Sequence, residues 1–299
     1  FKEILMKNIS FDRRSLLRSG LFLGSAAAFG VFGNQLLFAA DDKTAEDAVA
    51  GLGWKIGPQI YSFNRFKFDE AIKKVKETGA TSFELYSGQQ LSKDNKVKVG
   101  PALQGDNFKI FQDLINETGC KPHAMGVCPA DRAHFEFAAK IGLSVINLEP
   151  PFNKIAEVNK LAEEYKVKVG LHNHPKPSIY WDPEIVLKQL ADSGDMVGAC
   201  CDTGHWLRSG LDPLECVKKF KGRIMSFHIK DIVKQGNGFT FVPLGKGDCK
   251  ITEILQEVAA QKVKIPFSIE YEQDWNNNVQ PIKESITFFR EAAGKLIKK

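Results

Sequence analysis

The feature that most constrains the fold of this chain is a repeat that starts near residue 55. Short apolar runs alternate there with amphipathic segments of about a dozen residues, a pattern typical of buried strands followed by helices. Strands that alternate with helices pair in parallel. We therefore predict eight strands, at residues 55–63, 81–87, 121–128, 143–150, 167–174, 196–202, 223–231 and 265–272.

The segments between these strands have the spacing of helices with one buried face. In FDEAIKKVKETG, the apolar residues Phe68, Ile72 and Val75 share one face, and Gly79 ends the helix. Eight strand and helix pairs in a chain of this size predict an α/β fold, a closed (β/α)8 TIM barrel. The alternative is an open doubly wound sheet, but no glycine-rich GxGxxG turn follows the first strand.

Residues 1–40 lie outside the repeat and are typical of an export signal. Arg13 and Arg14 precede an uncharged stretch rich in Gly, Ala, Leu and Phe, from Ser19 to Ala40. This layout predicts a twin-arginine signal peptide at 1–40, a single barrel domain at 41–299 and a periplasmic or exported protein. A membrane anchor is the alternative, but the stretch is glycine-rich and weakly hydrophobic, so we expect no stable membrane association after cleavage.

Charge and cysteine content narrow the functional classes. The leader carries five basic and two acidic residues, so the net charge falls from +5 for the whole chain to +2 for residues 41–299. A nucleic-acid partner is not expected at such a balance. The six cysteines contain no CxxC pair and several lie in apolar runs, which favours buried free thiols over disulfides. The sequence leaves open whether the protein forms a homo-oligomer.

Barrel enzymes carry their chemistry at the C-terminal ends of the strands, which makes those positions the place to look for a site. Polar residues at the predicted strand ends include five of the six histidines: Gln59, Tyr61, Glu84, His123, Glu149, His172, His174, Asp202, His205, His228, Lys230, Asp231, Glu270 and Glu272. Asp202, His228 and Glu270 form the strongest subset, because each follows an apolar run. Mixed carboxylate and imidazole ligands suit a divalent ion such as Mn, Zn, Co or Mg, which can stabilise an enediolate.

Four motifs on the predicted strands 5 to 8, in the order LHNHP, CDTGHW, SFHIKD and SIEYE, resemble those of a known family. They are similar to the xylose isomerase-like barrel superfamily of sugar phosphate isomerases and epimerases. The resemblance implies a metal-dependent enzyme that acts on a small carbohydrate. It also implies that Asp202, His228 and Glu270 bind the metal and that His205 lies near the substrate.

Strand 5 departs from the family pattern, because His172 stands where many members carry a catalytic glutamate. Either His172 is itself a metal ligand, or Glu149 on the preceding strand supplies the missing carboxylate. Proton transfer then needs a second group besides Glu270, and we predict His174, whose imidazole suits acid and base chemistry near neutral pH. Lys230 is predicted to neutralise an oxyanion.

Five residues are predicted to contact the substrate: Gln59, Glu84, His123, Trp181 and Trp206. The two tryptophans would form an apolar wall for a sugar ring, although each also fits ordinary packing. His123 equally fits a core histidine, and Glu84 a salt bridge at the rim. Two long polar segments, 87–106 and 233–248, fit active-site lids or flexible inserts.

The leading functional hypothesis is a sugar isomerase or epimerase that works by enediolate chemistry on a carbohydrate or its keto derivative. A lyase or hydratase acting on a 3-keto-glycoside uses the same chemistry and suits a histidine base. A periplasmic sugar-binding protein is the non-enzymatic alternative, but it would not need Asp202, His228 and Glu270 to converge. An apurinic endonuclease is disfavoured, because it would need three metals and a basic DNA-binding face, and the near-neutral charge argues against such a face.

Overall fold

The computed structural model describes residues 44, 46–191 and 193–297. The predicted signal peptide at 1–40 lies outside these residues. Residues Ala48–Lys299 form one compact unit. Within the described part of the chain, no helix combines the length and the apolar character that crossing a membrane requires.

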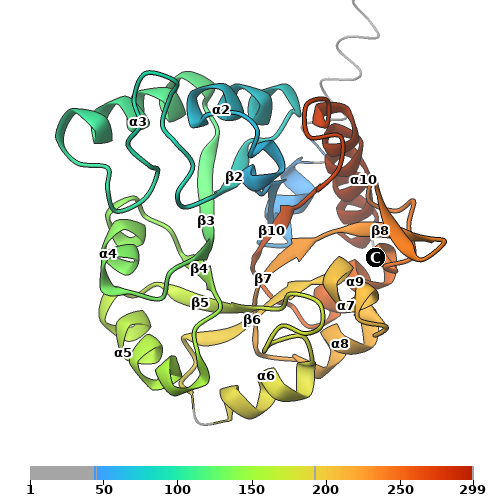
Figure 1. Ribbon diagram of the computed structural model, residues 1–299. Coiled ribbons are helices and arrows are strands. Elements are labelled where there is room, and N and C mark those ends of the chain that lie inside the picture. Colours follow the sequence, from blue (N-terminus) through green and yellow to red (C-terminus); the bar gives the residue numbers. More distant parts are fainter. Residues whose placement is uncertain (1–43, 45, 192, 298–299) are drawn as a thin grey trace, which may run out of the picture. The chain divides into compact units, whose positions relative to one another are not determined.

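Eight parallel strands form one sheet, in the order β1-β10-β7-β6-β5-β4-β3-β2. A parallel bridge between Gln59 and Glu84 links the two outer strands, so the sheet curves round into a nearly closed barrel (Figure 1). The strands are β1 Lys55–Pro58, β2 Ser82–Leu85, β3 Lys121–Cys128, β4 Val145–Leu148, β5 Lys168–His172, β6 Val197–Asp202, β7 Ile224–Ile229 and β10 Pro266–Ile269. The predicted (β/α)8 barrel is confirmed.

Helices follow the strands and lie outside them in Figure 1. They are α2 Phe68–Glu77, α3 Gly105–Thr118, α4 Arg132–Lys140, α5 Ile155–Tyr165, α6 Pro183–Leu190, α8 Pro213–Lys219, α9 Ile251–Ala260 and α10 Val279–Ile297. The predicted apolar face of α2 is buried, at Phe68, Ile72 and Val75. Burial of one apolar stripe against the sheet is what stabilises such a helix.

The first predicted strand ends early, whereas the sixth ends at Asp202 as predicted, and after each a polar side chain starts a new element. The first strand stops at Pro58, and the Gln59 side chain accepts a hydrogen bond from the Tyr61 N–H at the start of a 3-10 helix, η1 Ile60–Phe63. After β6, the carboxylate of Asp202 accepts the His205 N–H and begins the short helix α7 Thr203–Arg208. Each side chain satisfies a backbone donor that a helix start leaves unpaired.

The two polar segments predicted as lids or flexible inserts are structured in this protein. Residues 87–106 pack on the barrel through the buried side chains of Leu91, Val99 and Leu103. Residues 233–248 contribute to an antiparallel hairpin of β8 Asp231–Gln235 and β9 Gly238–Val242. Its two-residue turn includes Gly236 at φ 57°, where glycine is favoured. All six cysteines are free and buried, as expected.

Candidate metal centre and adjoining pocket

Four side chains from neighbouring strands converge at the C-terminal end of the barrel. His172 and Asp202 end β5 and β6, His228 is the penultimate residue of β7, and Glu270 directly follows β10. One ligand atom from each lies within 4.8 Å of the others, and all four residues are buried. Strand register explains the convergence, since Asp202 pairs with His228 across β6 and β7.

Three of the ligand atoms in this cluster are buried without a hydrogen bond, although the Lys230 ammonium lies 2.9 Å from Asp202 Oδ2. Within the described residues, His172 Nε2, Asp202 Oδ2 and His228 Nδ1 are buried and accept or donate no hydrogen bond. His172 Nε2 lies 3.4 Å from Asp202 Oδ2, and His228 Nδ1 lies 3.1 Å from Glu270 Oε2. Leaving such atoms unsatisfied costs about 1–3 kcal/mol each. Two imidazole nitrogens and two carboxylate oxygens therefore fit a divalent metal ion.

A buried or partly buried glutamate stands behind each histidine of the cluster. Glu84 Oε1 lies 2.9 Å from His228 Nε2, and Glu149 Oε1 lies 2.8 Å from His172 Nδ1. Such outer partners fix the tautomer and the ring orientation of a metal-binding histidine. The geometry therefore favours His172 as the fourth ligand, with Glu149 behind it. Glu84, predicted to contact substrate, is instead fully buried behind His228.

Electrostatics at the cluster reflect closely packed opposite charges. Burial opposes protonation of His228, but the carboxylates of Glu84 and Glu270 outweigh it and raise the pKa of this imidazole to about 10. Burial likewise opposes ionisation of Glu270, yet Lys230 and His228 lower the pKa of that carboxyl. Burial also works against the carboxylate of Asp202, whose pKa His205 and Lys230 nevertheless hold well below its usual value. Both acidic ligands are therefore ionised near neutral pH.

Lys230 is a buried counter-ion rather than a group exposed to substrate. Its Nζ lies 2.9 Å from Asp202 Oδ2, 3.0 Å from Glu270 Oε2 and 2.6 Å from Glu272 Oε1. These carboxylates outweigh burial and raise the pKa of Lys230 above its usual value. Lys230 is 1% exposed and is not among the residues that line the pocket, which corrects the prediction that it meets an oxyanion of the substrate directly.

His205 is neutral and held in place by Lys230. Burial, with a further contribution from the Lys230 charge, lowers the pKa of His205 well below its usual value. The Lys230 ammonium, 3.0 Å away, donates to His205 Nε2. On the other side of the ring, Nδ1 lies 3.5 Å from Arg208 Nη1. His205 lines the pocket, and its place beside the substrate stays a prediction.

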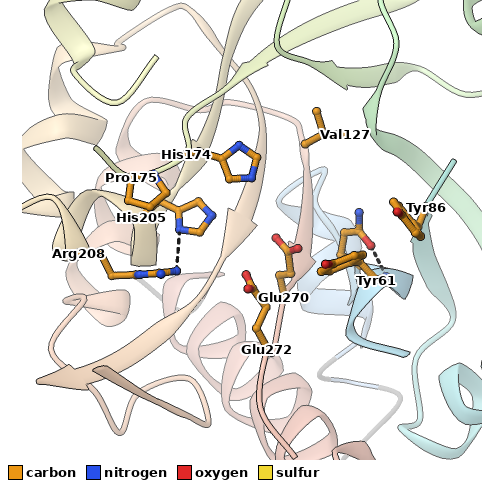
Figure 2. Close-up of a pocket in the computed structure, with 10 residues that line it drawn as sticks. Tyr61, Tyr86, Val127, His174, Pro175, His205, Arg208, Glu270 and Glu272 are labelled. Carbon is orange, nitrogen blue, oxygen red and sulfur yellow. Dashed lines mark hydrogen bonds between the residues drawn. The ribbon is translucent and has the colours of Figure 1, made fainter. Parts of the chain in front are cut away.

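A pocket of about 380 Å³ adjoins the cluster. Figure 2 shows histidines and an arginine on one side, two tyrosines on the other and two glutamates between them. The lining residues are Gln59, Tyr61, Tyr86, Val127, His174, Pro175, His205, Arg208, Glu270 and Glu272. Glu270 thus belongs both to the cluster and to the pocket, so a substrate in the pocket would lie beside the metal centre.

His174 faces the pocket from the loop after β5. Its Nδ1 hydrogen-bonds to Glu149 Oε1, the same oxygen that holds His172, and its side chain is 46% exposed. This leaves His174 Nε2 available to a substrate. Gln59 also lines the pocket, but its amide is engaged by the backbone, since Nε2 donates to the carbonyl of Gly126.

Three predicted substrate contacts are corrected by the structure. The ring nitrogens of His123 lie 3.0 Å from the hydroxyls of Ser82 and Ser268, so this buried histidine belongs to the barrel interior. Helix α7 directs Trp206 into the core, where its ring stacks on Phe220 with centroids 5.9 Å apart. Trp181 lies outside the pocket wall, with the ammonium of Lys176 3.8 Å from its ring centroid.

Six pocket residues had no role assigned from the sequence, and four of these have polar side chains. Tyr61 and Glu272 are strand-end residues, so their position alone was a signal. Tyr86 directly follows β2, and its ring centroid lies 4.9 Å from that of Tyr61 in an edge-on contact. Arg208 ends α7, and only the capping role of Asp202 in CDTGHW could have indicated this helix.

Comparison with known proteins supports this reading of the fold. A family model described as xylose isomerase-like TIM barrel matches residues 72–292. The inosose dehydratase of Bacillus thuringiensis (strain Al Hakam) is 31% identical over 169 residues, which are 49% of this chain and 56% of that protein. The chain therefore spans about half the length of the curated relatives it matches.

Solved structures share the architecture. An uncharacterised protein from Parabacteroides distasonis is 29% identical, with a TM-score of 0.64 over 80% of this chain and 99% of its own. A xylose isomerase-like TIM barrel protein from Mycobacterium smegmatis, crystallised in complex with magnesium, is 14% identical, with a TM-score of 0.65 over 77% and 89%. At that identity the second likeness concerns the fold alone.

Proposed function

This chain belongs to the xylose isomerase-like TIM barrel family, and we propose that it is a divalent-metal-dependent enzyme of carbohydrate chemistry. The proposed reaction begins with removal of a proton from a carbon next to a carbonyl group. The observation that carries this proposal is the convergence of four buried ligand residues beside a pocket that also contains His174. A sugar-binding protein would have no need for such a cluster.

The residues of the site divide between two roles in the proposed reaction, binding of the ion and transfer of the proton. A divalent ion held by His172, Asp202, His228 and Glu270 would draw electron density from a carbonyl oxygen and acidify the neighbouring C–H bond. His174 Nε2 takes the proton, while Glu149 holds the opposite nitrogen and stabilises the imidazolium.

We propose a lyase as the overall activity. The C–O bond one carbon further breaks, its electron pair goes to the departing oxygen, and that oxygen takes the proton from His174. The products are an unsaturated ketone and water or an alcohol. His172 supports this outcome: both sides of its ring are engaged, by Glu149 and by the cluster, so strand 5 offers no second carboxylate for proton exchange. Dehydratases among the relatives agree with it.

Isomerisation or epimerisation is the second candidate, because His174 and Glu270 line the same pocket. Two acid and base groups at one carbon could remove a proton and return it to a different position or face. This outcome leaves every C–O bond of the substrate intact, which separates it from the lyase by the product alone.

The experiment that tests the proposal uses keto-sugars and cyclic polyol ketones in heavy water, with protein loaded with Mn, Zn, Co or Mg. Nuclear magnetic resonance would follow deuterium uptake next to the carbonyl. Loss of water or alcohol identifies the lyase, whereas deuterium uptake with all C–O bonds kept identifies the isomerase or epimerase. Sugar binding without exchange or product under any of the four metals would overturn the enzyme proposal.

His174→Gln tests the assignment of the base. We expect kcat to fall about 10²- to 10⁴-fold, because a positioned general base contributes that much, with the metal content unchanged. His134→Gln is the matched control, since His134 lies in α4 and pairs with Asp131 rather than with the cluster. Equal loss of activity in both variants would remove His174 from the mechanism.

We infer export from residues 13–40, with the small-molecule substrate met outside the cytoplasm. Cell fractionation of the full chain, compared with an Arg13→Lys and Arg14→Lys double variant, tests this directly. The parent protein is expected in the exported fraction and the variant inside the cell, because the twin-arginine pathway reads the paired arginines. Equal distribution of the two would contradict a twin-arginine route.

A further inference from the structure

Arg208 lies between two hollows of the protein surface. It lines the active-site pocket and also a neighbouring depression of about 580 Å³. The depression lies between α7 and the β8–β9 hairpin, and its polar and aromatic walls include Lys234, Asn237, Phe239 and Asp248. Figure 1 shows this hairpin in orange, projecting from the barrel on the side of α9 and α10.

We propose that this depression is a second subsite, which holds the second sugar unit of a two-ring substrate whose keto-sugar unit occupies the active-site pocket. The inference rests on the proposed function for the identity of the first ring. Under the lyase reaction, the second unit leaves as the alcohol when the C–O bond between the rings breaks. The hairpin is thereby assigned a role in substrate selection.

The chemistry of the walls suits a hydroxylated ring. Phe239 is only partly buried and offers an apolar face, whereas Asn237, Asp248 and Lys234 offer hydrogen-bond acceptors and donors around it. An aromatic surface combined with a few polar groups is the usual composition of a site for such a ligand. Together the active-site pocket and the depression give room for two linked sugar units.

Arg208 can reach a ligand at the junction because it has no carboxylate partner. Among the described residues it forms no ion pair, and its Nη1 lies 3.5 Å from His205 Nδ1. Figure 2 shows the guanidinium at the edge of the pocket, beside His205. A guanidinium in this position can donate to ring or bridging oxygens of both units.

The hairpin wall is anchored to the barrel and is therefore preformed. The backbone N–H of Phe241 in β9 donates to Gln273 Oε1, 3.0 Å away, and Gln273 lies three residues after Glu270. The hydroxyl of Tyr271 also donates to the carbonyl of Phe241. These contacts join the second subsite to the segment that carries Glu270, so the two hollows keep a fixed position relative to each other.

Kinetics with paired substrates test the subsite. We would compare a 3-keto-disaccharide with the corresponding 3-keto methyl glycoside and measure kcat/KM for each. The wild type is expected to prefer the two-ring substrate about tenfold or more. Phe239→Ala should lower the ratio of the two values about tenfold, and Phe239→Tyr should restore it. Phe152→Ala, a partly exposed phenylalanine outside both hollows, is the control and should leave the ratio unchanged.

Binding of unreactive sugars separates failure of the subsite from failure of the proposed function. Calorimetry with cellobiose and with glucose needs no turnover. If the wild type binds cellobiose more tightly than glucose, and Phe239→Ala loses this difference in affinity, the subsite is supported even if no keto-sugar reacts. Equal affinity for both sugars, or a kinetic ratio that Phe239→Ala leaves unchanged, would overturn the subsite while turnover of a one-ring keto-sugar still upheld the proposed function.

Discussion

At the scale of single residues, the partner of each imidazole decides what a histidine does in this protein. Glutamates hold one nitrogen of His172 and one of His228, which turns the other nitrogen of each toward the candidate metal-binding cluster. His174 shares a glutamate with His172 but faces the pocket. Among the residues that the structure describes, His123 has two serine hydroxyls and no carboxylate in hydrogen-bond contact, and it lies in the barrel interior.

Asp202→Asn tests the metal cluster without removing the cap of α7, because an amide oxygen can still accept the His205 N–H. We expect metal affinity to fall about 100-fold or more, since the substitution removes a charged ligand. Titration calorimetry with Zn or Mn would measure this. The matched control is Asp212→Asn, because Asp212 caps α8 in the same way, through the Leu214 N–H at 3.0 Å. Loss of affinity in both variants, or in neither, would contradict the site.

His123 is expected to make the protein less stable in acid. Burial lowers its pKa in the folded state to about 4, whereas an unfolded histidine titrates near 6.5. Below about pH 6.5 the unfolded chain therefore binds a proton that the folded chain does not, and the free energy of unfolding falls until about pH 4. His123→Asn should remove about 3 kcal/mol of this decline. Urea unfolding at several pH values would show it, and an unchanged slope would contradict it.

At the scale of elements, the helix α7 and the loop after the β8–β9 hairpin, which are additions to the eight-fold repeat, each depend on one carboxylate. Asp202 begins α7, and Asp231 at the start of β8 holds the loop that follows the hairpin. The carboxylate of Asp231 accepts the backbone N–H groups of Gly245, Gly247 and Cys249 at 2.8, 2.9 and 3.1 Å. A Cβ at Gly247 would lie 2.2 Å from Asp231 Oδ1, so a glycine is required there.

Asp231→Ala should destabilise the protein by about 3 kcal/mol, because three backbone donors lose their charged acceptor. Urea unfolding followed by circular dichroism would measure the change. Asp195→Ala is the control, since Asp195 is exposed, and such a substitution shifts stability by less than about 0.5 kcal/mol. If the two variants unfold at the same urea concentration, the loop does not depend on this carboxylate.

At the scale of the whole molecule, the four candidate metal ligands come from β5, β6, β7 and β10, which are neighbours in the sheet, although His172 and Glu270 lie 98 positions apart in the sequence. An ion that binds there recognises the closed barrel and not the unfolded chain. Binding of the metal and folding are therefore linked.

Metal loading should raise the melting temperature of the chelator-treated protein. A free metal concentration about 100-fold above Kd adds about 2.7 kcal/mol, which corresponds to about 5–10 °C for a domain of this size. Differential scanning fluorimetry with each of Mn, Zn, Co and Mg would measure the shift. Asp202→Asn should show little or none of it, and an equal rise in that variant would place the ion elsewhere.

The order of strands and helices was determined by the sequence alone, because burial of one helix face and of each strand leaves a local periodic pattern. The convergence of Asp202, His228 and Glu270 could also be predicted, since parallel strands of a barrel present their C-terminal ends at one face. The helix α7 and the β8–β9 hairpin were not predicted, because each depends on one cap or one two-residue turn rather than on a repeated pattern.

Only the tertiary structure decided how the polar residues divide their roles. The pattern at the strand ends placed Glu84, Glu149 and Lys230 near the site. It did not show that the two glutamates hydrogen-bond to histidines from behind, or that the lysine forms ion pairs with three carboxylates. The direction of Trp206 likewise follows from α7. Periodicity in sequence records which residues are buried, whereas the contacts of a side chain depend on neighbours that the closed barrel brings from distant strands.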